Sequence, residues 1–148
     1  MKPIIERVTE YDAPEILELI LKYFPYLEND LPLLLKRILD SHFFLQKCMV
    51  NERLAGFSEW QIIDSEKKIV RLNGIVVKPM HQRKGYATAL LEKGEEWARK
   101  KKANKIILLV AETNMGAKKM YQKEGYSFSR WNLKKINGEK AEIWEKKI

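Results

Sequence analysis

Apolar residues recur along this chain with two periods, one typical of strands and one typical of helices. Runs rich in apolar and β-branched residues, bounded by short polar turns, predict strands. They cover residues 4–9, 43–50, 54–63, 68–77, 106–110, 126–133 and 140–144. Apolar residues spaced by three and four positions predict helices that bury one face. These cover residues 12–25, 30–40, 85–101 and 115–124.

The order of these elements predicts the fold class. Strands and helices follow one another as β-α-α-β-β-β-α-β-α-β-β, with short polar connections that indicate antiparallel hairpins among strands two to four. Residues 68–110 form a strand–helix–strand unit, so its two strands should lie parallel at the centre of the sheet. We therefore expect an α/β fold of the α+β type, with a mixed sheet of about seven strands flanked by about four helices. A length of 148 residues predicts a single domain over residues 1–148.

Two local signals refine these boundaries. Asp12 is expected to cap the first helix, with Pro14 in the first turn and Glu15 completing a capping box. The pair Asn137-Gly138 is the strongest signal for a two-residue hairpin turn, and it predicts that the last two strands form a hairpin.

The charge of the chain does not by itself indicate a nucleic-acid partner. The formal net charge is +8, and 45% of the residues are apolar, which is enough to bury a core. The densest basic run, residues 99–102, falls at a helix C-terminus, where the helix dipole favours cations. A basic stripe interleaved with aromatic residues, which nucleic-acid binding would need, is lacking. We expect no nucleic-acid partner.

Metal, disulfide and membrane chemistry are not expected either. The single cysteine, Cys48, cannot form an intramolecular disulfide, and its apolar surroundings predict a buried thiol. The two histidines, His42 and His81, lie far apart in the sequence, so we expect no metal site. Because the chain shows no signal-peptide core and no stretch long enough to span a bilayer, we expect no membrane association and a cytoplasmic location.

The segment after the strand at 68–77 has the features of a phosphate site. Gly85 precedes a long helix, whose first turn presents unpaired backbone N–H groups at the positive end of the helix dipole. Glycine also allows an anion to approach the backbone closely. Arg83 and Lys84 add positive charge beside it. The alternative is an ordinary strand-to-helix loop with solvated basic residues, and this loop alone does not separate the two interpretations.

Two motifs together make the chain resemble the GNAT superfamily of N-acetyltransferases. The pyrophosphate loop of that family reads Gln/Arg-x-x-Gly-x-Gly/Ala, which Gln82, Gly85 and Ala87 match. Its second signature reads Asn-x-x-Ala-x-x-x-Tyr followed by Gly-Phe/Tyr. The residues that match it are Asn114, Ala117, Tyr121, Gly125 and Tyr126. The resemblance is motif-specific over residues 75–126.

The resemblance implies a binding site for acetyl-CoA, used as a co-substrate and without a metal. Backbone groups of Ile75, Val76 and Val77 are expected to pair with the pantetheine amides, while Asn114 hydrogen-bonds the pantetheine arm and Ala117 flanks it. The pyrophosphate is expected at the loop and first helical turn, formed by Gln82, Arg83, Lys84, Gly85, Tyr86, Ala87 and Thr88. The fourth and fifth strands are expected to splay apart and to open the notch for the thioester.

Catalysis in this family is direct transfer of the acetyl group from the thioester to an amine. Tyr121 is the expected general acid for the leaving thiolate, because a phenol with a pKa of about 10 is protonated at neutral pH; the alternative is a core tyrosine. A backbone N–H near Val76 is a candidate for the oxyanion. The strand at 69–77 contains no acid, so the base is Glu59, a water oriented by Asn73, or a water relay alone. A solvent-facing Glu59 is the competing interpretation.

The acceptor is expected between the first two helices and the third strand, with the last hairpin closing over it. The aromatic residues in those segments, which either shape this pocket or fill the core, are Tyr23, Phe24, Tyr26, Trp60 and Trp131. We expect an N-acetyltransferase for a primary amine, which is a small molecule, a lysine or a protein N-terminus. The alternative is an acyl-CoA-binding regulatory domain without turnover. The protein is expected to be a monomer or a homodimer.

Overall fold

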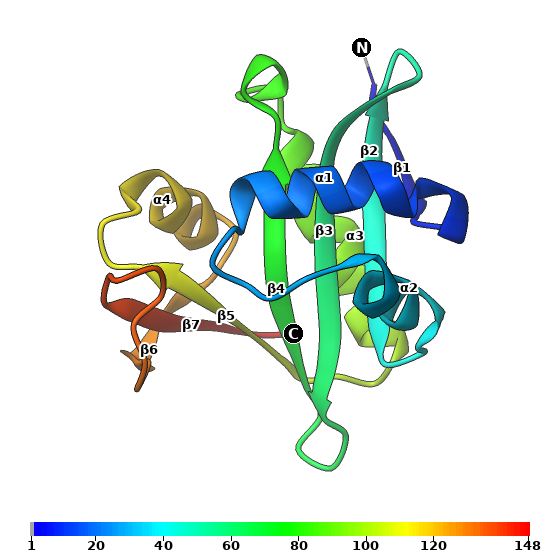
Figure 1. Ribbon diagram of the computed structural model, residues 1–148. Helices are drawn as coiled ribbons and strands as arrows, with labels where there is room; N and C mark the ends of the chain where they lie inside the picture. The colour runs from blue at the N-terminus through cyan, green and yellow to red at the C-terminus, as the bar shows by residue number, and fades with distance from the viewer. Residues whose placement is uncertain (1) are drawn as a thin grey trace.

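The computed structural model describes residues 2–148. It contains a seven-stranded sheet in the order β1-β2-β3-β4-β5-β7-β6 (Figure 1). The strands are β1 (Ile4–Arg7), β2 (Phe43–Val50), β3 (Arg53–Asp64), β4 (Ile69–Val77), β5 (Lys105–Ala111), β6 (Ser127–Trp131) and β7 (Ala141–Lys147). The helices are α1 (Ala13–Tyr23), α2 (Leu31–Leu39), α3 (Tyr86–Lys100) and α4 (Met115–Lys123), with short 3₁₀ turns η1 (Glu10–Asp12) and η2 (Pro79–His81). The predicted mixed α/β fold is confirmed.

The sheet combines an antiparallel and a parallel part. Strands β1 to β4 pair antiparallel in order, whereas β4 and β5 pair parallel through the crossover that contains α3. Strand β7 then inserts antiparallel between β5 and β6, which leaves β6 at the edge. The prediction that residues 68–110 form a parallel strand–helix–strand unit is therefore confirmed.

Helices cover both faces of the sheet. Helices α1 and α2 lie in front of β2, β3 and β4 in Figure 1, and α3 lies behind them. The first face buries a cluster around Ile16, Leu34 and Phe57, and the second buries one around Trp60 and Leu91. The predicted buried thiol of Cys48 is confirmed, because this residue is fully enclosed.

Strands β4 and β5 separate after only part of their length, which confirms the predicted splay. Their parallel pairing ends at Leu72 and Leu108. On its other side β4 has a bulge at the same level, because Glu59 of β3 pairs with Gly74 while the next residue of β3 pairs with Leu72. Asn73 is thus the extra residue. A bulge bends its strand and increases the local twist, so the bend at Asn73 turns the end of β4 away from β5.

The prediction for the start of the first helix is correct in position and wrong in its contacts: Asp12 is the N-cap residue of α1, and Pro14 lies in the first turn. Asp12 is itself in a helical conformation and makes no cap hydrogen bond to α1. Its carboxylate instead accepts from the backbone N–H of Thr9 at 2.8 Å, so Thr9 and Asp12 form the capping box of η1. Lys47 donates to the second oxygen of the same carboxylate at 2.8 Å. The tertiary ion pair therefore holds Asp12 in its position, and Glu15 is not the capping partner.

The predicted last hairpin forms, but with a longer connection. Asn137 and Gly138 both have positive φ, and Ile136 pairs with Glu139 around them, as a two-residue turn requires. This small hairpin lies between β6 and β7 and belongs to neither strand.

Candidate functional site

A cleft of about 1000 Å³ opens where β4 and β5 part. It extends from the end of β4 to the first turns of α3 and α4. The predicted site residues that line it are Ile75, Val76, Val77, Gln82, Arg83, Gly85, Tyr86, Ala87, Thr88, Asn114, Ala117 and Tyr121. Two predicted residues lie elsewhere: Lys84 is exposed outside the cleft, and Glu59 lines a neighbouring pocket. The fold thus gathers two motifs that lie about a quarter of the chain apart.

One wall of the cleft is the open edge of β4. Antiparallel pairs alternate between residues that bond to the neighbouring strand and residues that do not. Lys78 donates to Ala55 at 2.8 Å, so by this alternation Val76 also directs its N–H toward β3. The N–H groups of Ile75 and Val77 therefore point to the side that β5 has left. The oxyanion candidate near Val76 is accordingly one of these two amides.

Gln82 closes part of this edge with its side chain. Its amide nitrogen donates to the carbonyl oxygen of Val77 at 2.9 Å. This bond ties the loop after η2 back to the end of β4 and fixes where α3 begins. The side chain of Gln82 therefore holds this loop in position beside the cleft.

The N-terminus of α3 forms the end of the cleft. Gly85 precedes the helix with φ +82°, a conformation that side chains rarely adopt, and the first helical hydrogen bond runs from Ala89 to Gly85 at 3.0 Å. The amides of Ala87 and Thr88 precede that bond and carry the positive end of the helix dipole. Within residues 2–148, no aspartate or glutamate lines the cleft, while Arg83 does. The end of the cleft is suited to an anion.

The second motif lies at the start of α4 on the opposite wall. The side-chain oxygen of Asn114 caps this helix by accepting from the amide of Ala117 at 3.2 Å. Only the side-chain NH₂ of Asn114 is then left to donate to a ligand. Lys118 donates to the buried Glu142 of β7, and this partly buried ion pair fixes α4 against the sheet.

Tyr121 belongs to the core and is also one of the residues that line the cleft. The residue is 6% exposed, and its ring packs against Tyr126 with the centroids 5.8 Å apart. Burial raises the pKa of Tyr121 above its usual value of 10.0, so the phenol keeps its proton at neutral pH. Within the described residues, no hydrogen bond involves this hydroxyl. The residue is both a packing tyrosine and a free hydroxyl donor.

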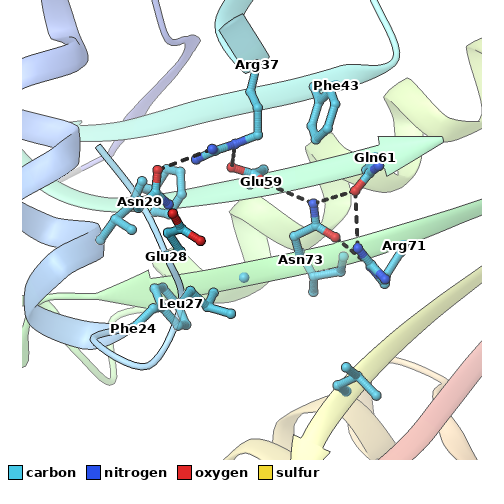
Figure 2. A pocket seen from close by; sticks show the side chains of 15 residues that line it. Phe24, Leu27, Glu28, Asn29, Arg37, Phe43, Glu59, Gln61, Arg71 and Asn73 are labelled. Atoms are coloured by element: carbon cyan, nitrogen blue, oxygen red, sulfur yellow. Dashed lines mark hydrogen bonds and ion pairs between the residues drawn. The ribbon is translucent and has the colours of Figure 1, made fainter. Parts of the chain in front are cut away.

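A second pocket of about 430 Å³, which we call the acceptor pocket, adjoins the cleft (Figure 2). It lies between the α1–α2 loop, α2 and the middle of β3 and β4. The two spaces adjoin at the point where β4 and β5 part, because they share the lining residues Phe24, Leu27, Leu72, Asn73, Gly74 and Leu109. A molecule in the acceptor pocket would therefore lie next to a molecule in the cleft.

Glu59 lies inside the acceptor pocket, so the competing interpretation, in which it faces solvent, is wrong. It is 8% exposed. Arg37 donates from Nε to Oε1 at 3.0 Å, and Asn73 donates from Nδ2 to Oε2 at 2.7 Å. Figure 2 shows that this chain of hydrogen bonds continues from Asn73 to Gln61 and Arg71 along the pocket wall. Both oxygens of the only buried acid in this pocket thus already have donors.

Three charged residues of the acceptor pocket were not predicted from the sequence, namely Glu28, Arg37 and Arg71. Arg71 had a signal: Arg71 and Asn73 are polar residues two positions apart in an otherwise apolar strand, as Glu59 and Gln61 are in β3. Polar pairs at that spacing share a sheet face. Glu28 and Arg37 had no comparable signal, because charged residues in a loop and on an amphipathic helix are ordinary.

The aromatic residues divide between the site and the core. Tyr23, Phe24 and Tyr26 line the cleft, whereas Trp60 is fully buried against Gly94 and belongs to the core. Trp131 is 49% exposed on β6 and lines neither space. The loop before Ala141 contributes to the cleft through residues 135–137, so the last hairpin borders the cleft and not the acceptor pocket.

Other kinds of site find no support in the described part of the chain. Residues 2–148 contain no group of three or more histidine, cysteine, aspartate or glutamate side chains that could hold a metal ion. None of the helices in that range is both long and apolar enough to cross a membrane.

The sequence model of the Acetyltransferase (GNAT) family matches residues 13–126. The chain belongs to this GNAT family. The match starts at the first residue of α1 and ends at Tyr126, so it includes both motifs and both walls of the cleft. No protein with a curated description matches the chain.

Solved structures of GNAT proteins share the fold at low sequence identity. The PaiA N-acetyltransferase of Thermoplasma acidophilum, solved in complex with coenzyme A, superimposes with a TM-score of 0.80 at 20% identity and covers 100% of both chains. The ribosomal-protein-S18-alanine N-acetyltransferase of Escherichia coli has a TM-score of 0.80 at 21% identity, covering 99% of this chain and 94% of its own. Ard1 of Thermoplasma volcanium has a TM-score of 0.85 at 16% identity, covering 100% and 99%. At these identities the likeness supports the fold of this GNAT protein.

Proposed function

We propose that this protein is an N-acetyltransferase that transfers the acetyl group of acetyl-CoA directly to a primary amine. The observation that carries the proposal is the junction of two spaces at Asn73 and Gly74, one suited to a long anionic cofactor and one to a second substrate. The amine belongs to a small molecule, a lysine or a protein N-terminus. Residues 1–148 would then act as a single catalytic domain.

The residues of the cleft fit acetyl-CoA. The N–H groups of Ile75 and Val77 offer an open strand edge for the pantetheine amides, much as a further strand would use it. The first turn of α3 and Arg83 suit the pyrophosphate, since helix N-termini and guanidinium groups both stabilise phosphate oxygens. Acetyl-CoA supplies the thioester, and the protein supplies position and proton transfer.

Tyr121 is the proposed general acid. Its hydroxyl has no partner within the described residues, and its raised pKa keeps it protonated. A donor held in a buried position can stabilise negative charge on a departing sulfur more strongly than water can. The same raised pKa makes full proton transfer less favourable, so its contribution is mainly that of a hydrogen bond in the transition state.

Glu59 with Asn73 is the proposed route for the amine proton. Asn73 sits at the junction and Glu59 accepts its hydrogen bond at 2.7 Å. Since both Glu59 oxygens already accept bonds, a water held by this pair is the simplest carrier of the proton. The proton passes from the amine to this water and then to a remaining lone pair of Glu59, while Asn73 holds the carboxylate in position.

Because both carboxylate oxygens of Glu59 already accept hydrogen bonds, a second function is also favoured: an acyl-CoA-binding regulatory domain without turnover. In that case the cleft would bind acetyl-CoA, but the acceptor pocket would have no means to deprotonate an amine. Release of free CoA from acetyl-CoA in a screen of amines distinguishes the two, because only the enzyme produces it.

Binding of acetyl-CoA is tested by thermal melting. A ligand at about 100 times its Kd stabilises the folded state by about 2.7 kcal/mol, which should raise the Tm. Gly85→Glu places a negative charge at the helix N-terminus and should abolish this rise. Gly85→Ala is the matched control, because it adds the same backbone strain at φ +82° without the charge, and no atom lies within 4 Å of its new Cβ. Equal Tm rises in wild type and Gly85→Glu would overturn the proposed cofactor site.

The role of Arg83 is tested against its neighbour. Arg83 lines the cleft and Lys84 does not, so Arg83→Ala should weaken acetyl-CoA and Lys84→Ala serves as a charge-matched control. The loss should be larger at low salt, since screening weakens contacts of exposed charges. Identical affinities of the two variants at low ionic strength would mean that Arg83 does not contact the phosphates.

A further inference from the structure

The wall of the acceptor pocket holds two guanidinium groups, and its buried carboxylate, Glu59, pairs with just one of them. Arg37 donates to Glu59 at 3.0 Å and to the side-chain oxygen of Asn29 at 3.2 Å. Arg71 donates only to neutral amides, those of Asn73 at 2.7 Å and Gln61 at 3.2 Å. The wall therefore carries one positive charge in excess.

Each of these two guanidinium groups keeps a nitrogen available for a ligand. Within residues 2–148, neither Nη2 of Arg37 nor Nη1 of Arg71 makes a hydrogen bond or an ion pair. The bonds of the other nitrogens fix the plane of each group before a ligand arrives. A planar, pre-oriented guanidinium is the side chain best suited to bind a carboxylate.

The position of Arg71 links this charge to the reaction. Its Nε lies 2.7 Å from the side-chain oxygen of Asn73, so the guanidinium sits at the level of the bulge and not farther down β4. The bulge is where the acceptor pocket joins the cleft. An amine at this junction would hold a neighbouring carboxylate within reach of Arg71.

The rim of the pocket supplies the opposite charge. Glu28 lines the pocket from the α1–α2 loop and is exposed, and within the described residues its carboxylate has no hydrogen bond or ion pair (Figure 2). The remaining lining is mostly apolar, with Phe24, Leu27, Phe43 and Phe57 among it. The pocket thus offers the unpaired carboxylate of Glu28, one positive charge in excess on its wall, and a mostly apolar lining.

We propose that the acceptor is an α-amino acid with an apolar side chain, with its carboxylate bound by Arg71 and Arg37 and its ammonium group met by Glu28. This inference rests on the proposed function and names its substrate class. A zwitterion matches both charges, and a volume of about 430 Å³ is in the range of pockets for small molecules. Transfer forms the amide C–N bond and breaks the thioester C–S bond. Of the two protons that the ammonium group loses, one leaves through water and the other balances the proton that the sulfur takes up, so that CoA leaves as the thiol.

The test compares three amines that differ only at the carboxylate. L-Phenylalanine carries it, phenylalaninamide replaces it by a neutral amide, and phenethylamine lacks it. We expect kcat/KM for phenylalanine to exceed that for each of the other two by about 10- to 100-fold, the effect of one to two charge-assisted hydrogen bonds. Equal values for the three amines would overturn the inference.

Three variants assign the effect to residues. Arg71→Gln should raise KM for phenylalanine about 10-fold or more and leave KM for phenethylamine within about twofold. Glu28→Gln should raise KM for both, because both carry an amine. Arg53→Gln, an exposed arginine on the same sheet outside the pocket, is the control and should change neither. If Arg71→Gln lowers the activity equally with phenylalanine and with phenethylamine, Arg71 has a structural role only.

Turnover and calorimetry together separate failure of this inference from failure of the proposed function. If acetyl-CoA is turned over with phenethylamine as readily as with phenylalanine, the function stands and the carboxylate subsite does not. If none of the amines is acetylated, we would measure binding of phenylalanine to the CoA-saturated protein. Binding that Arg71→Gln removes would support the subsite and remove the catalytic proposal. Absence of binding would overturn the subsite as well.

Discussion

Tyr121→Phe is the substitution that best separates an enzyme from a protein that only binds acetyl-CoA. The change removes one oxygen and keeps the ring, whose packing against Tyr126 at 5.8 Å between centroids should persist. The hydroxyl has no partner within residues 2–148, so its loss leaves no buried group unsatisfied. The melting temperature and the affinity for acetyl-CoA should therefore hardly change.

The expected effect on turnover follows from the interaction that is lost. A hydrogen bond to a charged group contributes about 1.5–3 kcal/mol, which corresponds to a factor of about 10 to 150 in rate. The raised pKa of Tyr121 favours the lower part of this range, since a weaker acid transfers less of its proton in the transition state. We therefore expect kcat to fall about 10- to 50-fold, again as the cost of one weakened hydrogen bond.

The assay is steady-state release of free CoA with a saturating amine, together with melting of the same samples with and without acetyl-CoA. Arg53→Gln is a suitable comparison, since Arg53 is exposed and lines neither the cleft nor the acceptor pocket. The reasoning is refuted if Tyr121→Phe retains wild-type kcat. It is equally refuted if kcat falls only in proportion to lost stability or lost acetyl-CoA affinity, because Tyr121 would then act by packing alone.

Two further predictions concern stability. Gly94→Ala should destabilise the fold by about 3 kcal/mol or more, because a Cβ at Gly94 would lie 1.9 Å from the ring of Trp60. This exceeds the usual cost of overpacking. Urea denaturation measures the free energy of unfolding, and a loss below about 1 kcal/mol would contradict the prediction. Burial alone would raise the pKa of Glu142, but the hydrogen bonds from Lys118 and Trp144 and the charge of Lys118 outweigh it, so the net pKa is lowered from 4.5. The ion pair then stabilises the fold above pH 4.5 and loses its effect as pH falls through the lowered pKa, so the Tm difference between wild type and Glu142→Gln should shrink on acidification; a constant difference would contradict this.

Periodicity was sufficient to predict the elements of this fold. Strand and helix segments are long and strongly patterned, and the parallel pair follows from the strand–helix–strand order. Boundaries that depend on distant contacts were not predictable in the same way. Strand β7 continues to Lys147 because β5 pairs with it along its whole length, although its last residues are charged. The capping of η1 depends likewise on Asp12 and on Lys47, which lies on another element.

The cleft and the acceptor pocket also differ in how far their residues could be predicted from the sequence. The cleft is built from two local motifs whose spacing in the sequence is fixed by a strand and a helix, so its residues were predictable. The acceptor pocket depends on side chains from six helices and strands and from the α1–α2 loop, which meet only in the folded chain. Arg37 comes to Glu59 from a helix 22 positions away, and no local pattern announces that contact. The state of Glu59, buried and already paired, is therefore a property of the fold.

The bulge at Asn73 connects these two halves. If β4 continued regularly, its pairing with β5 would extend past Leu72 and close the strand edge that faces the cleft. The extra residue ends that pairing and at the same time turns the Asn73 side chain toward Glu59, Gln61 and Arg71. One local irregularity thus opens the cleft and supplies the central link of the acceptor wall. A change in the acceptor pocket would therefore reach the junction first through the amide of Asn73. For this reason we expect substrate choice and turnover to be coupled at Asn73.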